Sequence, residues 1–272
     1  MKPVLTDELV GAAAALLARH TGLVFPAARR RALEDALARL SRRIGGAEAC
    51  VERLAAGDPG LFDQLIADIT VGETYFFRHP GQLAAIRELV LPELASRVRG
   101  RPIRIWSAGC ASGEEAYTLA ILALEAGLAD RVQITATDLS RLALARAVRG
   151  RFGRWSLRST PDESRTRYFR EAGTEFELLP EIRRLVTFAY HNLATDPYPA
   201  LGNGLFGMDL VLCRNVMIYL DAEVVARVSR QLVATLAPGG WLIAGAADPS
   251  IADHAPCEVV IAGCGLLFRR NL

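Results

Sequence analysis

The chain has 272 residues, of which 51% are hydrophobic and 23% are charged, and its formal net charge is +2. This balance is ordinary for a globular protein with a hydrophobic core, and it excludes a disordered or fibrous chain. The small net charge argues against a nucleic-acid-binding surface that covers the whole chain. No run of about 18 uncharged apolar residues occurs, so we expect no membrane insertion. Asp7 and Glu8 stand where a secretory signal needs its apolar core, and we therefore expect a cytoplasmic protein.

The five cysteines and four histidines give no sign of a metal site or a disulfide framework. No two cysteines form a CxxC pair, and no two histidines are spaced i, i+4 as helical metal ligands. We expect reduced, buried cysteines and no bound metal.

Residues 1–72 predict helices and no strands. Thr6 is suited to cap a first helix with apolar residues at helical spacing, and Pro26 opens a second helix. Two shorter helices are expected at 47–56 and 59–69, on either side of a Gly-Asp-Pro-Gly turn. The pattern predicts a small, all-helical N-terminal domain.

From about residue 100 the pattern alternates between strands and helices. Strands are expected at 103–106, 132–137, 185–190, 208–213 and 241–244 and near 266–268, and helices at 114–126, 142–148 and 221–236. The segment Pro238-Gly239-Gly240 is expected to be the turn before a strand. This alternation predicts an α/β fold with a parallel, doubly wound (Rossmann-like) sheet. Residues 150–184 interrupt the alternation, and we interpret them as an insertion with a short β element near its end.

A loop of small residues follows the first strand and leads directly into a helix. It runs from Ser107 to Gly113, and Glu114 and Glu115 occupy the first helical turn. In a doubly wound sheet this position binds the ligand, and small residues let the backbone approach it closely. Two acids here would repel a pyrophosphate but would suit a ligand with a cationic amino group. A tight turn followed by two helix-favouring acids is the alternative interpretation.

An acidic residue, Asp138, ends the second strand. A carboxylate at this position can accept hydrogen bonds from both hydroxyls of a ribose. The alternative is a helix N-cap, a position that Asp often occupies. Together with the small-residue loop, Asp138 favours a ribose-bearing cofactor.

Two longer segments carry a resemblance to a known family. They are TVGETYFFR at 70–78 and CRNVMIY at 213–219. With the SGEE sequence at 112–115, Asp138 and the His-Asn-Leu sequence at 191–193, they closely resemble the chemotaxis receptor methyltransferase (CheR) family. The resemblance covers nearly the whole chain. It implies a class I S-adenosylmethionine-dependent methyltransferase fold.

The resemblance also implies a division of the chain. Residues 1–72 would form a helical domain that docks on a receptor, and residues 73–272 would form the methyltransferase domain. The insertion at about 150–184 would be a small β subdomain. Whether that subdomain grips a receptor tail stays open.

A role is implied for each residue that matches the family's motifs. The cofactor-binding residues would be Gly72, Thr74, Arg78, Glu115, Asp138, Asn192, Leu193, Arg214 and Asn215. Arg78 would lie near the methionine carboxylate, and Glu115, rather than Glu114, would bind the amino group. Asp138 would hold the ribose, Asn192 and Leu193 would flank the adenine, and Arg214 and Asn215 would lie beside the methionine and its methyl group. Arg78 and Tyr219 would be the catalytic residues.

Gly72 departs from the family pattern, because members often carry Asn at this position. A side-chain amide contact to the cofactor would then be missing, which costs about 0.5–1.5 kcal/mol if nothing replaces it. We expect weaker cofactor binding from this difference, but not its loss.

The implied reaction is methyl transfer from S-adenosylmethionine to the γ-carboxylate of specific glutamates on chemoreceptor cytoplasmic domains. Its products would be the glutamate methyl ester and S-adenosylhomocysteine. A basic patch on the second helix would dock on the acidic receptor: Arg29, Arg30, Arg31, Arg39, Arg42 and Arg43. An ordinary solvated helix face is the alternative for this patch. Nothing in the sequence requires more than a monomer.

Two other functions stay open on sequence alone. Nucleic-acid amino-methyltransferases commonly carry two prolines and an aromatic residue after the fourth strand, whereas residues 215–219 here lack the prolines. A catalytically weak adaptor that binds cofactor and receptor is the other alternative, and Gly72 is the residue that points to it.

Overall fold

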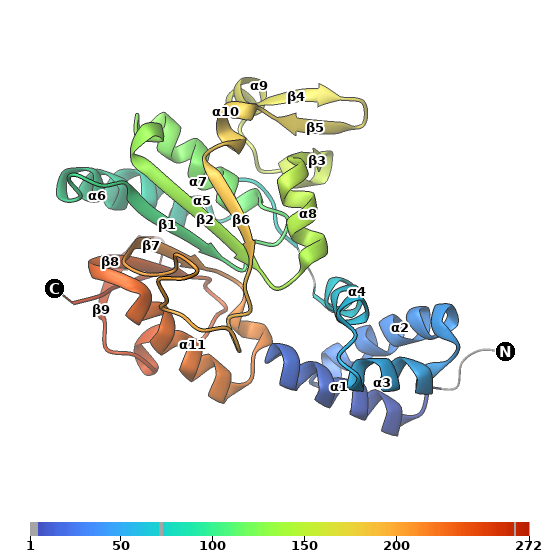
Figure 1. Ribbon diagram of the computed structural model, residues 1–272. Coiled ribbons are helices and arrows are strands. Elements are labelled where there is room, and N and C mark those ends of the chain that lie inside the picture. The colour runs from blue at the N-terminus through green and yellow to red at the C-terminus, as the bar shows by residue number, and fades with distance from the viewer. Residues whose placement is uncertain (1–4, 71–72, 264, 272) are drawn as a thin grey trace.

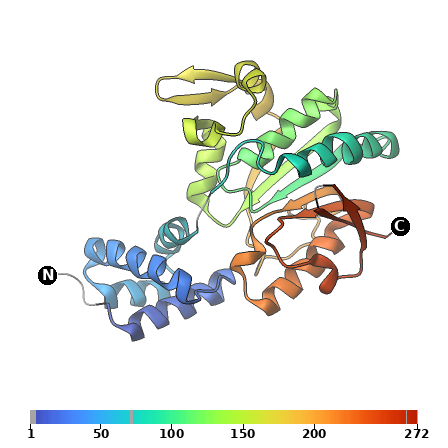
Figure 2. The same cartoon turned by 180° about the vertical axis from the view of Figure 1, so that it is seen from behind.

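The computed structural model describes residues 5–70, 73–263 and 265–271. Four helices build its N-terminal part and lie beyond the carboxyl ends of the parallel strands, as both views show (Figures 1 and 2). They are α1 (Asp7–Thr21), α2 (Ala27–Ile44), α3 (Ala47–Ala55) and α4 (Pro59–Ile69). Thr6 caps α1 as expected, since its side chain accepts a hydrogen bond from the Leu9 N–H. The apolar faces of the four helices meet in a core that includes Leu17, Leu37 and Leu65.

A seven-stranded sheet forms the centre of the molecule. In spatial order its strands are β6 (Val186–Tyr190), β2 (Val132–Asp138), β1 (Ile103–Ala108), β7 (Met208–Cys213), β8 (Leu236–Ala244), β10 (Gly265–Arg269) and β9 (Glu258–Ala262). Strands β6 to β8 run parallel, and β10 is antiparallel to both β8 and β9. Every residue of β7 is buried, as expected for a central strand covered on both faces. The predicted doubly wound α/β fold is confirmed.

Helices cover both faces of this sheet. They are α5 (Pro80–Ala85), η1 (Ile86–Val90), α6 (Leu91–Arg97), α7 (Glu114–Glu125), α8 (Arg141–Arg149) and α11 (Ala222–Thr235), with short turns η2 (Ala129–Arg131), η4 (Met217–Tyr219) and η5 (Ile251–Asp253). The first four of these helices and α8 share one hydrophobic core with the sheet, and α11 packs into a second core on the other face. The helical run at 80–97 was not among the predicted elements, nor was β9. None of the described helices is long and apolar enough to cross a membrane.

The insertion folds as a small antiparallel sheet beside the main one (Figure 1). It contains β3 (Arg151–Gly153), η3 (Arg154–Leu157), α9 (Asp162–Tyr168), β4 (Phe169–Ala172), β5 (Glu175–Leu178) and α10 (Pro180–Arg183), with the strand order β3-β5-β4. The expected β element is β5, which pairs with both neighbours. Phe152 and Phe169 pack edge-on against Phe76, with ring centroids 4.8 and 4.9 Å apart. The insertion is therefore anchored on the ETYFFR segment.

The expected turn at Pro238-Gly239-Gly240 is wrong in one respect, because β8 already begins at Leu236 and contains these residues. The pairing with β7 jumps from Met208–Leu236 to Leu210–Trp241, so the three residues form a bulge within the strand. Gly239 and Gly240 exchange backbone hydrogen bonds with Arg270. The glycines thus mark a bulge rather than the end of the preceding helix.

The strand order places a binding crevice at the carboxyl ends of the central strands. From β1 the chain continues to β2 and β6 on one side, and later returns to β7 and β8 on the other. Loops leave the carboxyl ends of β1 and β7 in opposite directions, and such a switch point is where open α/β sheets bind ligands.

Candidate functional site

Two adjoining cavities, of about 130 and 140 Å³, lie at this switch point. Gly109, Ala111, Asn215 and Tyr219 line both of them. The first also contains the predicted residues Asp138, Asn192 and Leu193, and the second contains Thr74, Arg78, Glu115 and Arg214. The structure therefore brings together all the predicted site residues that it describes. Gly72 lies outside the described residues.

The loop after β1 forms the floor shared by both cavities. Gly109 has φ +78°, and a Cβ added there would lie 2.4 Å from Val216 Cγ2. Only glycine fits this position, because the backbone is left-handed and the loop after β7 packs directly against it. The loop and the CRNVMIY segment are thus in contact across the switch point.

Asp138 holds this loop at the end of β2. Its carboxylate accepts hydrogen bonds from the N–H of Ala111 and of Ser140, both at 2.7 Å. The helix cap itself is Ser140, whose hydroxyl accepts from Ala143, so the N-cap alternative for Asp138 is wrong. Burial raises the pKa of Asp138, while these backbone N–H groups oppose the shift.

Glu115 forms a buried ion pair with Arg214. Arg214 Nε lies 2.7 Å from Glu115 Oε2, and the Ser107 hydroxyl donates to Oε1 at 2.7 Å. Each carboxylate oxygen keeps a second lone pair, so Glu115 can still accept from a ligand amino group. Glu114 is turned away from the cavities, toward the hydroxyls of Ser112 and Ser156.

Arg214 in turn joins two segments that are far apart in sequence. Its Nη1 donates to the Arg78 carbonyl at 3.1 Å and to Gln82 Oε1 at 3.0 Å. Gln82 donates to the Ala244 carbonyl at the end of β8. This chain of bonds fixes the ETYFFR segment against the carboxyl ends of the central strands.

Asn215 adopts a strained backbone, with φ +58°. A residue that sequence reasoning missed stabilises it: the carboxylate of Asp248 accepts hydrogen bonds from the N–H of Asn215, Ile218 and Gly245. Burial raises the pKa of Asp248, against the effect of those N–H groups. The only sequence signal was an acid shortly after a strand of the sheet.

Arg78 and Thr74 close the second cavity from the ETYFFR side. Arg78 Nη1 donates to the Glu73 carbonyl at 2.6 Å, and its Nε is buried without a hydrogen-bond partner. Buried polar atoms of this kind call for a ligand or solvent to satisfy them.

The first cavity has an apolar wall to which the N-terminal helices contribute. Leu193 and Leu139 face Leu23 and Thr21 from the turn after α1. Asn192 Nδ2 donates to the His20 carbonyl at 2.7 Å, so its amide is bound to α1. Sequence reasoning placed no residue before Gly72 in the site, because such contacts join distant parts of the chain: the Asn192–His20 bond spans 172 positions.

Arg29 lies against Tyr219, which lines both cavities, and not on an exposed surface, so its place in the predicted docking patch of six arginines is corrected. Its Nη2 donates to the Ile218 carbonyl at 2.7 Å, and its Cζ lies 4.2 Å from the centroid of the Tyr219 ring. Arg30 is half-buried and pairs with Asp7 and Glu34. The exposed members of the set are Arg31, Arg39, Arg42 and Arg43.

The described cysteines and acids give no metal site. No group of three or more His, Cys, Asp or Glu residues suited to a metal occurs within the described ranges. Cys110 and Cys213 are buried near the crevice, and burial raises the pKa of both thiols well above their ordinary value.

The donor set of the crevice fits S-adenosylmethionine. Acids at Glu115 and Asp138 match an amino group and a ribose, and the unpartnered Arg78 Nε matches a carboxylate. The leucine-lined wall matches the apolar faces of an adenine. The start of α7, where a pyrophosphate would bind in a dinucleotide fold, carries Glu114 and Glu115, which would repel it.

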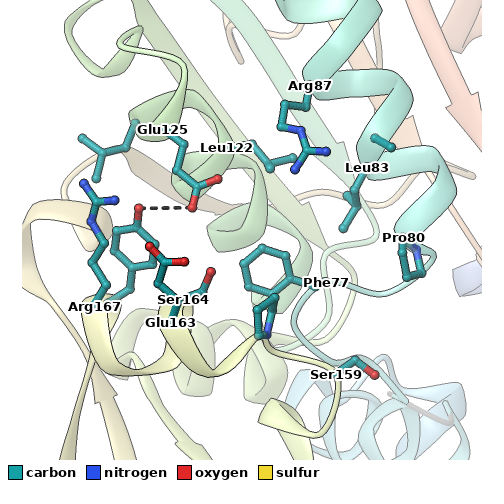
Figure 3. Close-up of a pocket in the computed structure, with 14 residues that line it drawn as sticks. Phe77, Pro80, Leu83, Arg87, Leu122, Glu125, Ser159, Glu163, Ser164 and Arg167 are labelled. Atoms are coloured by element: carbon teal, nitrogen blue, oxygen red, sulfur yellow. Dashed lines mark hydrogen bonds between the residues drawn. The ribbon is translucent and has the colours of Figure 1, made fainter.

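A larger cavity, of about 730 Å³, lies away from the switch point, between α5, the end of α7 and α9 (Figure 3). Phe77, Leu83 and Leu122 line it together with Arg87 and Arg167, and the Tyr168 hydroxyl donates to Glu125 at its edge. It contains none of the predicted site residues. Size alone therefore does not identify the site, whereas position at the switch point of the sheet does.

Comparisons with known proteins agree with the crevice. Residues 72–258 match the family described as CheR methyltransferase, SAM binding domain. A chemotaxis protein methyltransferase of Listeria innocua is 36% identical over 70% of this chain and 70% of its own. Chemotaxis protein methyltransferase 1 of Pseudomonas aeruginosa is 35% identical over 80% of this chain and 81% of its own. A probable biofilm formation methyltransferase, WspC, of the same organism is 34% identical over 79% of this chain and 50% of its own.

The family match covers more than half of the chain, and two of these relatives align over at least 70% of both sequences. The cofactor set of the crevice, the doubly wound sheet and the ETYFFR and CRNVMIY segments agree with it. This chain belongs to the CheR family of S-adenosylmethionine-dependent methyltransferases that act in chemotaxis.

Proposed function

We propose that this enzyme methylates the γ-carboxylate of specific glutamates on chemoreceptor cytoplasmic domains. The observation that carries the proposal is that the described residues lining the second cavity include no histidine, and both of its carboxylates are already paired, Glu73 with Arg158 and Glu115 with Arg214. Glu115 is engaged by Arg214 and Ser107, and burial holds Cys110 in its thiol form. A glutamate acceptor has a pKa near 4.3 and is already an anion at neutral pH, so it needs no base.

When bound, S-adenosylmethionine supplies a methyl group on a cationic sulfur. The residues of this chain would hold the cofactor as their chemistry suggests: Glu115 and Arg78 at the amino acid end, Asp138 at the ribose, and Asn192 and Leu193 at the adenine. Thr74, Arg214 and Asn215 would complete the methionine end. Alignment of the acceptor oxygen with the methyl carbon in a water-poor crevice contributes about 7–11 kcal/mol in favourable systems.

We assign the catalytic positions to Arg78 and Tyr219, which line the second cavity. The guanidinium of Arg78 is suited to attract the incoming carboxylate, and the Tyr219 hydroxyl to orient it. A Tyr219→Phe variant tests the hydroxyl: near-normal turnover would remove it from this role.

We propose that α2 docks on the receptor through Arg31, Arg39, Arg42 and Arg43. All four are exposed, and Arg39 makes only a surface ion pair with Asp68. A surface ion pair of this kind contributes little to stability, so Arg39 can readily pair with another acid instead. The acidic glutamate-bearing face of a receptor is a matching partner, and it implies a cytoplasmic enzyme.

We further propose that residues 1–72 and 73–272 are separate domains that act together in a monomer. The four N-terminal helices have a hydrophobic core of their own, which supports the boundary. A single chain contributes every proposed site residue that the structure describes, which supports the monomer.

The direct test is peptide mapping of a receptor cytoplasmic fragment after incubation with the enzyme and S-adenosylmethionine. We expect methyl groups on glutamates of the fragment and nowhere else. Methyl groups on lysine or on nucleic acid instead would contradict the proposed acceptor.

A further inference from the structure

The proposed docking helix α2 is joined to the methyl-transfer crevice by one side chain, Arg29. It lies in the first turn of α2, two positions before the exposed Arg31. Its guanidinium is directed toward the loop after β7, where it bonds the Ile218 carbonyl at 2.7 Å and covers the Tyr219 ring at 4.2 Å. Two basic neighbours on one helix therefore have different surroundings.

The contact of Arg29 is largely withdrawn from water. Its Nη1 is buried and has no hydrogen-bond partner, so the charge is held by the Ile218 carbonyl and the face of the aromatic ring. A cation over an aromatic face is attracted more strongly when water is excluded. A hydrogen bond from a charged donor is also stronger than one between neutral groups.

The surrounding backbone reinforces the same junction. The Val24 N–H donates to the Tyr219 carbonyl at 2.9 Å, and Leu23 forms an isolated bridge with Leu220. On the other side, Asp248 holds the N–H of Asn215 and of Ile218. The loop that carries Tyr219 is therefore held between the sheet and the start of α2.

We propose that Arg29 is a positioning residue for methyl transfer: it fixes the Tyr219 ring and thereby couples α2 to the crevice. This inference rests on the proposed function of Tyr219 and α2. Arg29 lines neither cavity, so it acts through Tyr219 and not by touching the cofactor. Its role differs from that of Arg31, which acts only in docking.

The test compares Arg29→Met with Arg19→Met, which removes the same charge from an exposed position on α1. Methyl transfer to a receptor fragment and binding of S-adenosylhomocysteine are both measured. We expect Arg29→Met to lower kcat about tenfold, with little change in the KM for the receptor. Arg29→Lys keeps the cation over the ring and should restore part of kcat. Arg19→Met should leave both constants unchanged.

A double-mutant cycle with Tyr219→Leu separates positioning from a general loss of structure. If Arg29 acts through the ring, Arg29→Met should have little further effect on kcat once the ring is absent. The proposal would be overturned if the two substitutions reduced kcat additively, or if Arg29→Met raised the receptor KM and left kcat unchanged. If Arg29→Met does not fold, Arg29→Lys tests the positioning role instead. A kcat of Arg29→Lys no higher than the kcat of Tyr219→Leu would contradict that role.

Cofactor binding distinguishes this inference from the proposed function. Tyr219 lines both cavities, so Arg29→Met should weaken S-adenosylhomocysteine binding a few-fold by calorimetric titration, and Arg19→Met should not. If the wild-type enzyme methylates no receptor glutamate, the proposed function fails while this weakening still supports Arg29. If glutamates are methylated but binding and kcat of Arg29→Met are unchanged, the inference about Arg29 alone fails.

Discussion

At the scale of single residues, the crevice depends on two buried carboxylates with different tasks. Asp138 holds the loop after β1 and faces the first cavity. Asp248 lines neither cavity and holds the loop after β7 through backbone N–H groups. Burial raises the pKa of both, so both sites are sensitive to acid.

Removing the charge of Asp138 should weaken cofactor binding. A hydrogen bond to a charged acceptor contributes about 1.5–3 kcal/mol, so Asp138→Asn should raise the Kd for S-adenosylhomocysteine by roughly 10- to 100-fold. The single amide oxygen can accept from the N–H of Ala111 or of Ser140 but not from both, so urea unfolding of the variant is measured alongside the Kd. Calorimetric titration measures the Kd, and an unchanged value would exclude Asp138 from the ribose site.

The raised pKa of Asp138 also predicts opposite effects of pH on binding and on stability. Cofactor affinity requires the carboxylate, so it should fall as pH decreases through a value above the ordinary 3.8. In the same window the folded state binds more protons than the unfolded state, so the stability that Asp138 contributes is present in acid and is lost as pH rises. Calorimetric titration at several pH values measures cofactor affinity, and urea unfolding at the same pH values measures stability. In Asp138→Asn, the part of each pH dependence that comes from Asp138 should be absent.

Asp248 should matter for the position of the loop and for folding. Asp248→Ala leaves buried N–H groups of Asn215, Ile218 and Gly245 without their acceptor, at a cost of about 1–3 kcal/mol for each group that water does not reach. We expect a lower unfolding free energy and weaker cofactor binding. Asp253→Ala removes an exposed acid nearby and should change neither. Equal behaviour of the two variants in urea unfolding and calorimetry would contradict this account.

At the scale of elements, the loops after β1 and β7 meet at Gly109. A methyl group there would lie 2.4 Å from Val216 Cγ2, and the backbone is left-handed. Gly109→Ala should therefore displace one loop and weaken S-adenosylhomocysteine binding more than tenfold, since overpacking costs about 1–3 kcal/mol and the strained φ adds to it. Gly127 also has a positive φ but has open space around it. Gly127→Ala therefore shows the effect of a strained backbone without a steric clash. Similar Kd values for the two variants would contradict a steric role for Val216.

The exposed face of α2 should give the enzyme a salt-dependent affinity for its receptor. Screening shortens from about 10 Å at 0.1 M salt to about 3 Å at 1 M, so added salt should raise the Kd for a receptor fragment. The Kd for S-adenosylhomocysteine should change much less, because its contacts lie in a partly buried crevice. Arg42→Gln should flatten the salt dependence, and Arg19→Gln should not. A receptor affinity independent of salt would exclude electrostatic docking by α2.

Elements were predictable where their pattern is local. The cap at Thr6 and the apolar spacing of α1 specify that helix within a few residues of chain. The bulge at Pro238-Gly239-Gly240 was not predictable, because its glycines pair with Arg270 and with β7. The local sequence indicates an irregular backbone at these residues, but it does not distinguish a turn before a strand from a bulge within one.

At the scale of the whole molecule, the family's motifs predicted which residues meet at the crevice. Most of these residues follow the carboxyl end of a strand, whereas Thr74 and Arg78 come from the ETYFFR segment before α5. Arg29 and Leu23 were not predictable, since no motif joins them to Tyr219 and their contacts depend on how the N-terminal helices pack. Asp248 was not predictable either, because it is 30 positions from Ile218 in the chain and no motif joins the two. The complete site is therefore a product of the tertiary structure.

One measurement tests the central claim most directly: transfer of labelled methyl from S-adenosylmethionine to a receptor cytoplasmic fragment, followed by mild alkali. Carboxyl methyl esters hydrolyse and release volatile methanol, whereas methylated amines do not. We predict that the fragment becomes labelled and that alkali releases the label as methanol. Label that withstands alkali, or no label on any receptor of a panel despite cofactor binding, would contradict glutamate esterification by this enzyme.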